Sequence, residues 1–119
     1  MKAFTDLQQS KKLTEILPLE SADMYWWSSG KRYYIEAIDD GDFNEEEGHI
    51  RAWNLAALLD VLPDSIYDNT YEFSQLEFTK KSVAYIHGIT DGIKIGALKD
   101  NLVDACYEMI IKLHELKML

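Results

Sequence analysis

Hydrophobic residues recur at helical spacing near the end of the chain. Five of them follow one another at steps of three or four residues: Leu102, Cys106, Met109, Leu113 and Leu116. This spacing places them on one face of an α-helix. Asp100 is the expected N-cap, because its carboxylate can accept a backbone N–H that is left unpaired where a helix begins. We therefore predict a final helix that closes the hydrophobic core.

The N-terminal segment also predicts a helix, over residues 6–17. Thr5 and Gln8 have the spacing of a capping box, in which each side chain satisfies a backbone N–H of the first turn. Pro18 ends the helix, because proline disfavours the helical conformation in the residue before it. Residues 21–23 predict a turn that leads into the aromatic run of residues 24–27.

Aromatic and β-branched residues predict strands in the rest of the chain. The predicted strands cover residues 31–38, 49–53, 71–78, 82–87 and 93–98. The alternation of the third slips once, which predicts a β-bulge near Ser74 and Gln75. Asp91 and Gly92 favour a tight hairpin turn between the last two strands, since glycine adopts positive φ freely.

A second short helix is predicted over residues 55–62, with Asn54 as its N-cap and Pro63 after its last residue. It is apolar nearly all round, so we expect it to be buried. Most of the strands look linked as hairpins rather than by helical crossovers. This order predicts an α+β fold, in which an antiparallel sheet of three to five strands packs against about three helices. We expect a single domain over residues 1–119.

The chain is acidic, with 12 Lys and Arg against 21 Asp and Glu and a formal net charge of −9 at pH 7. Its basic residues cluster at most in pairs. A protein that binds nucleic acid or an anionic membrane needs a basic face. We therefore expect no direct nucleic-acid partner and no membrane partner.

Cys106 is the single cysteine, so no disulfide can form within the chain. This is typical of proteins in a reducing compartment. The first residues lack an apolar signal segment, and no apolar run approaches the roughly 18 residues that span a bilayer. We expect a cytoplasmic protein.

Residues 39–48 form the sharpest local signal, an acidic loop that begins like a calcium-binding loop. A calcium loop counted from Asp40 needs glycine at its sixth position and glutamate at its twelfth. Those positions hold Glu45 and Arg51, so we predict a solvated loop without a specific metal site. His49, His87 and His114 lie in separate elements and lack the spacing of metal ligands. We expect no metal, no cofactor and no catalytic residue, and Cys106 on an apolar helix face is expected to be inert.

Aromatic residues concentrate in the first half of the chain, above all at Tyr25, Trp26 and Trp27. One interpretation is that they pack in or near the core. The other is that they anchor a partner, because Trp and Tyr dominate the hot spots of protein interfaces. Adjacent tryptophans do not easily face the same core, so at least one indole should be partly exposed. Tyr25, Trp26 and Trp27 are our candidate partner-binding residues.

Three segments carry a resemblance to a known group. They are residues 10–26, which begin with SKKL and end with ADMYW, residues 52–63 (AWNLAALLDVLP) and residues 100–109 (DNLVDACYEM). Together they cover about a third of the chain and resemble a group of small uncharacterised proteins common in Bacteroidales genomes and in their phages and mobile elements. In that group the position of Asn54 is usually serine, which also caps a helix. The resemblance implies no known activity, substrate or catalytic residue.

Three functions remain open from the sequence. The preferred hypothesis is a non-enzymatic binding or accessory protein of phage or mobile-element origin, whose protein partner is a different protein or a second copy of the chain. The first alternative is an acidic mimic of nucleic acid that inhibits a DNA-binding protein. The second is a small enzyme whose polar residues are dispersed along the chain. A flat aromatic patch would favour the binding protein, and a regular stripe of carboxylates would favour the nucleic-acid mimic. A deep pocket with convergent ionisable groups would favour the enzyme.

Overall fold

A computed structural model of the protein describes residues 2–39, 42–67, 73–87 and 93–119. Within these residues the chain forms three α-helices: α1 (Leu7–Thr14), α2 (Leu55–Val61) and α3 (Leu102–Glu115). Two short 3-10 helices are also present, η1 (Leu19–Ser21) and η2 (Glu45–Glu47). The seven strands of the described residues are β1 (Met24–Ser28), β2 (Tyr33–Ala37), β3 (Ile50–Ala52), β4 (Ser65–Tyr67), β5 (Phe73–Phe78), β6 (Ser82–His87) and β7 (Ile93–Leu98).

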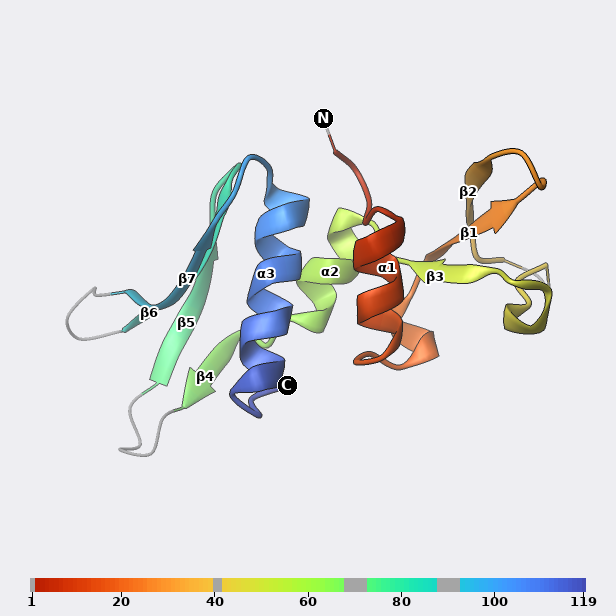
Figure 1. The fold of residues 1–119 in the computed structure, drawn as a ribbon. Helices are drawn as coiled ribbons and strands as arrows, with labels where there is room; N and C mark the ends of the chain where they lie inside the picture. The colour runs from red at the N-terminus through yellow and green to blue at the C-terminus, as the bar shows by residue number, and fades with distance from the viewer. Residues whose placement is uncertain (1, 40–41, 68–72, 88–92) are drawn as a thin grey trace.

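The strands divide into two antiparallel sheets, with the orders β2-β1-β3 and β4-β5-β6-β7. The two sheets lie at opposite ends of an elongated molecule of 52 × 27 × 22 Å, and the three α-helices lie between them (Figure 1). The predicted α+β class, with antiparallel strands and three helices, is confirmed over the described residues. The sequence did not separate the strands into two sheets, because local patterns do not identify pairing partners.

The main core lies between α3 and the inner face of the four-stranded sheet. Val83, Tyr85 and Ala97 of β6 and β7 are buried there. Helix α3 buries a wide face against them, made of Val103, Ala105, Cys106, Met109, Ile110 and Leu113. Leu13 of α1, Leu58 of α2 and Trp53 extend the same core towards the middle of the molecule. Three of the five predicted core positions of the last helix are thus buried.

The other two, Leu102 and Leu116, depart from the prediction. Leu102 is only partly buried, and Leu116 lies just after the last residue of α3 and is exposed. The N-cap is Asn101 rather than Asp100, since the Asn101 side chain accepts the backbone N–H of Asp104 at 2.9 Å.

The first helix has a capping box, but one residue later than predicted. The Asp6 carboxylate accepts the backbone N–H of Gln9 at 2.8 Å, and the Gln9 side chain accepts the backbone N–H of Asp6. Thr5 is instead fully buried, where its hydroxyl bonds to Ser10 Oγ at 2.8 Å and accepts the backbone N–H of Trp53 at 3.1 Å. The Thr5 side chain, which local spacing predicted to cap the helix, therefore makes tertiary hydrogen bonds instead.

Asn54 caps α2 as predicted, by accepting the backbone N–H of Ala57 at 2.8 Å. The helix is not buried all round, however. Leu58 is buried, but Ala56 and Asp60 are exposed. One face of a largely apolar helix therefore lies open among the described residues.

The strands at residues 82–87 and 93–98 have the predicted bounds. Two strands were not predicted from the sequence. β1 occupies the aromatic run, and β4 lies between the second predicted helix and the third predicted strand. The predicted bulge near Ser74 and Gln75 is wrong, since β5 pairs there in continuous register. The register shifts instead between β6 and β7, at Tyr85 and Ile86. The predicted turn at Asp91 and Gly92 falls outside the described residues.

Candidate partner-binding surface

Strands β1, β2 and β3 form a three-stranded sheet at one end of the molecule, which we call the wing (Figure 1). β1 is its middle strand and carries all three predicted partner-binding residues. Because side chains alternate along a strand, Tyr25 and Trp27 lie on one side of the wing and Trp26 lies on the other. The structure therefore divides the three residues between two faces.

Tyr25 is a packing residue, with only 3% of its surface exposed. Its ring stacks on His49 at 4.9 Å between centroids and meets Phe43 edge-on at 5.5 Å. Its hydroxyl donates to Glu36 on the neighbouring strand at 3.0 Å. Burial raises the pKa of Tyr25, and the hydrogen bond to Glu36 raises it further. Tyr25 thus joins the acidic loop to the wing and offers little surface to a partner.

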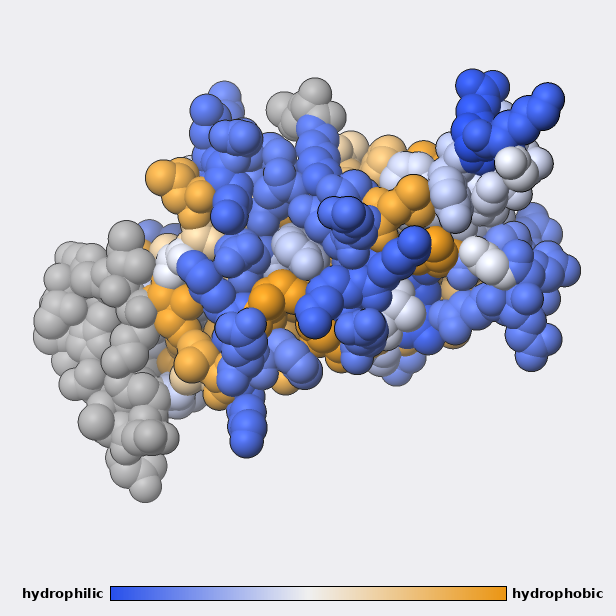
Figure 2. Space-filling model, in the orientation of Figure 1, coloured by the Kyte–Doolittle hydropathy of each residue, from blue (hydrophilic) through white to orange (hydrophobic). Residues whose placement is uncertain are grey.

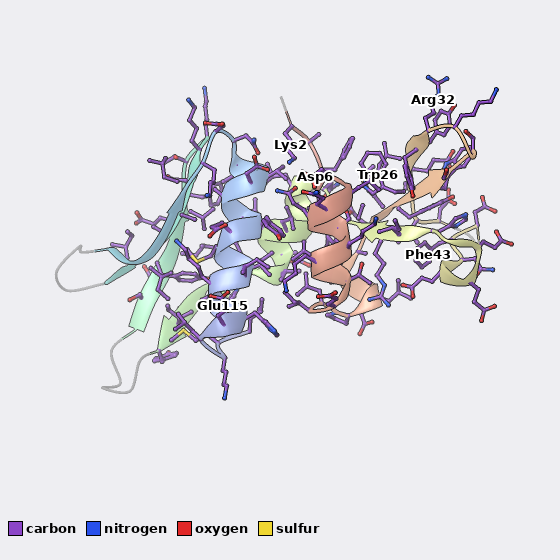
Figure 3. All side chains as sticks on the ribbon, viewed as in Figure 1. Lys2, Asp6, Trp26, Arg32, Phe43 and Glu115 are labelled. Carbon is purple, nitrogen blue, oxygen red and sulfur yellow. The ribbon has the colours of Figure 1, made fainter. Side chains whose placement is uncertain are left out.

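Trp26 lies at the base of the wing beside α1 (Figure 3). Its indole N–H donates to the backbone carbonyl of Thr5 at 3.2 Å, and Phe4 meets its ring edge-on at 5.6 Å. These contacts hold the ring, which stays partly exposed.

Side chains of β1, β2 and β3 share the side of the wing on which Trp26 lies. We call this surface the wing face, and it consists of Met24, Trp26, Tyr33, Ile35 and Ile50. Tyr33 is 43% exposed, and the other four are partly buried. Figure 2 shows hydrophobic residues gathered between α1 and the wing and hydrophilic residues at the wing's tip. Tyr33, Ile35 and Ile50 were not among the predicted site residues, because their shared face follows from strand register.

Trp27 is also partly exposed, on the opposite side of the wing. Its ring stacks on that of Tyr34, its cross-strand partner, at 4.7 Å. The Arg32 guanidinium in turn lies 5.1 Å from the Tyr34 ring. Among the described residues, the Trp27 indole N–H is the one buried side-chain polar atom without a hydrogen-bond partner. An unpaired buried donor costs about 1–3 kcal/mol.

The described part of the acidic loop is held by its own contacts. Asn44 caps η2 by accepting the backbone N–H of Glu46 at 2.9 Å, and its own backbone N–H donates to His49 Nδ1 at 3.0 Å. Arg51 forms an ion pair with Glu45 and donates to the backbone carbonyl of Leu17 at 3.1 Å. In the ranges that the structure describes, no group of three or more His, Cys, Asp and Glu side chains is placed to hold a metal ion.

The remaining candidate groups lie apart from the wing. Cys106 is buried in the core, and burial raises the pKa of its thiol to about 12. His114 is exposed on α3, and the side chain of His87 lies outside the described residues. Cys106 and His114 are therefore not part of the predicted site.

Comparisons with protein-family models, with curated proteins and with solved structures found no match to this chain. None of the helices in the described ranges is long and apolar enough to cross a membrane.

Proposed function

We propose that the protein is a non-enzymatic binding protein that docks a protein partner on its wing face. The observation that carries the proposal is the separation of the wing from the core. Among the described residues, no side chain of β1, β2 or β3 belongs to the main hydrophobic core, which is built from the helices, Trp53 and the four-stranded sheet. The aromatic residues of the wing are therefore not explained by the packing of that core.

The chemistry of the wing face suits a protein partner. Trp and Tyr supply large contact areas with few rotatable bonds, and they dominate the hot spots of interfaces. β2 is an edge strand of the wing, and an edge strand offers backbone groups to which a partner strand can pair. The resemblance of three segments to the Bacteroidales group supports an origin in a phage or mobile element, which is part of the proposal. The single cysteine supports a cytoplasmic location, which is also part of it.

Two variants separate this surface from the rest of the molecule. Tyr33→Ala removes the most exposed ring of the wing face, and Leu98→Ala is its control on the four-stranded sheet, where Leu98 is 75% exposed. Truncation of an exposed side chain usually changes stability by at most about 0.5 kcal/mol, so both variants should fold.

The test is affinity capture by wild type and both variants from cells of the source organism, quantified by mass spectrometry. We expect one protein to be enriched by wild type and by Leu98→Ala but lost with Tyr33→Ala. Sedimentation velocity of the same three proteins covers the case in which the partner is a second copy. A monomeric wild type whose captured proteins do not change with Tyr33→Ala would refute the proposal.

The nucleic-acid mimic is less well supported, for a reason of charge density. DNA carries one negative charge per 1.7 Å or so, and a duplex as long as this molecule's 52 Å axis would carry about 30. The protein has a net charge of −9, because 12 basic residues offset its 21 acids. Its charge per unit length is therefore about a third of that of the nucleic acid it would imitate.

A further inference from the structure

A groove of about 770 Å³ lies between η1, the segment that follows α1 and the open face of α2. Its apolar lining includes Ile16 from the segment that follows α1 and Ala56, Ala57 and Val61 from α2. A short helix that is apolar nearly all round normally has a cover on each face. Here the described residues leave Ala56 exposed in the groove. The two alanines add little bulk, so a second backbone can approach α2 closely.

The charge of the groove has one sign. Glu20, Asp23 and Asp60 line it, and among the described residues no Lys, Arg or His does. Glu20 and Asp60 are exposed, so their carboxylates are free to meet a cation at the edge of the groove. An apolar lining with acidic side chains beside it is complementary to a segment that presents apolar side chains on one face and basic side chains on the rest of its surface.

The groove is also preformed by hydrogen bonds within its wall. Ser21 Oγ accepts the indole N–H of Trp53 at 3.0 Å and donates to the backbone carbonyl of Pro18 at 2.6 Å. The Asp23 carboxylate accepts the backbone N–H of Asn54 at 2.9 Å. These bonds fix η1 against the start of α2, so a ligand would not have to order the wall that it meets.

We infer that this groove binds a basic amphipathic segment of a partner protein, with apolar side chains on α2 and Lys or Arg against Glu20 and Asp60. A second copy of the chain is a poorer occupant, because each copy has a net charge of −9. The groove and the wing face have no residue in common, so this inference goes beyond the proposed function and is tested separately from it.

The test is a nuclear magnetic resonance titration of the 15N-labelled protein with a synthetic 16-residue peptide. The peptide has leucine at helical spacing and lysine elsewhere, and a control peptide has glutamate in place of lysine. We expect the lysine peptide to shift the backbone amides of Ala22, Ala56 and Asp60, and the glutamate peptide to shift none of them.

Two double variants with the same change in charge make the test specific. The variant with Glu20→Lys and Asp60→Lys should weaken binding of the lysine peptide about tenfold, because it reverses the charge at the groove. The control carries Glu77→Lys and Glu115→Lys at exposed sites outside the groove and should change affinity by at most about twofold, through net charge alone.

Three results would overturn the inference. The first is that the lysine peptide does not bind or shifts amides away from the groove. The second is that both double variants weaken binding equally, which would mean that net charge alone attracts the peptide. The third is a wild-type dimer that the Glu20 and Asp60 variant dissociates, which would make a second copy the occupant.

Discussion

Two leucines, one in the last turn of α3 and one just after the helix, give a direct test of where the core lies. Leu113 is 0% exposed in the core, and Leu116, three residues later, is 54% exposed. Replacement of a buried leucine by alanine costs about 3–5 kcal/mol, through lost transfer free energy and the cavity that remains. Burial of a whole leucine contributes about 1.5–3 kcal/mol, so the half-exposed Leu116 should lose about 1 kcal/mol or less.

We therefore predict that Leu113→Ala lowers the free energy of unfolding by at least about 2 kcal/mol more than Leu116→Ala. Alanine is a good helix former, so helix propensity does not add to the loss at Leu113. Urea unfolding followed by circular dichroism measures both variants against wild type. At an m-value of about 1.5 kcal/mol per molar urea, a loss of 3 kcal/mol moves the midpoint by about 2 M. Equal midpoints for the two variants would refute the assignment of the core to this face of α3.

Three further predictions follow from named contacts. Burial alone would raise the pKa of Asp104, but its hydrogen bonds lower the pKa overall, and the bond from Lys2 at 2.7 Å has the largest effect among them. The Asp104 carboxylate therefore stabilises the fold at pH values above its ordinary pKa of 3.8. The stability advantage of wild type over Asp104→Asn should then shrink as the pH of urea melts falls from 7 to 3, and an advantage independent of pH would contradict this. Because burial raises the Cys106 pKa to about 12, its thiol should resist a disulfide reagent at pH 8 until urea unfolds the protein; rapid labelling of the folded protein would refute this burial. Thr5→Val should cost about 1–3 kcal/mol in a urea melt by leaving the backbone N–H of Trp53 without its acceptor, and an unchanged midpoint would exclude that role.

Elements with a strong local signal could be predicted from the sequence. The strands at 82–87 and 93–98 are short runs rich in β-branched and other apolar residues, and Asn54 stands directly before an apolar run that Pro63 follows. These features depend on residues only a few positions apart, so the local sequence is enough to predict them.

Features set by tertiary contacts could not be predicted. β4 has three residues, too few for an alternation to be read, and β1 is an aromatic run without a clear period. Thr5 and Asp6 are adjacent candidates for one cap, and only the buried bonds of Thr5 to Ser10 and Trp53 decide between them.

The candidate site shows the same limit. The tandem Trp26 and Trp27 predicted a partly exposed indole, and both indoles are partly exposed. The burial of Tyr25 depends on Phe43 and His49, which lie 18 and more residues away along the chain. Membership of Tyr33 in the wing face depends on the register of β1 and β2, which the sequence does not state.

Site-specific photo-crosslinking in cells of the source organism tests the central claim most directly. A photoreactive phenylalanine derivative replaces Tyr33 on the wing face or, as the control, Leu98 on the four-stranded sheet, since both positions are exposed. We predict one defined protein adduct from position 33, reduced when Trp26→Ala is added, and no such adduct from position 98. The absence of an adduct at position 33, or the same adducts from both positions, would contradict a partner that docks on the wing face.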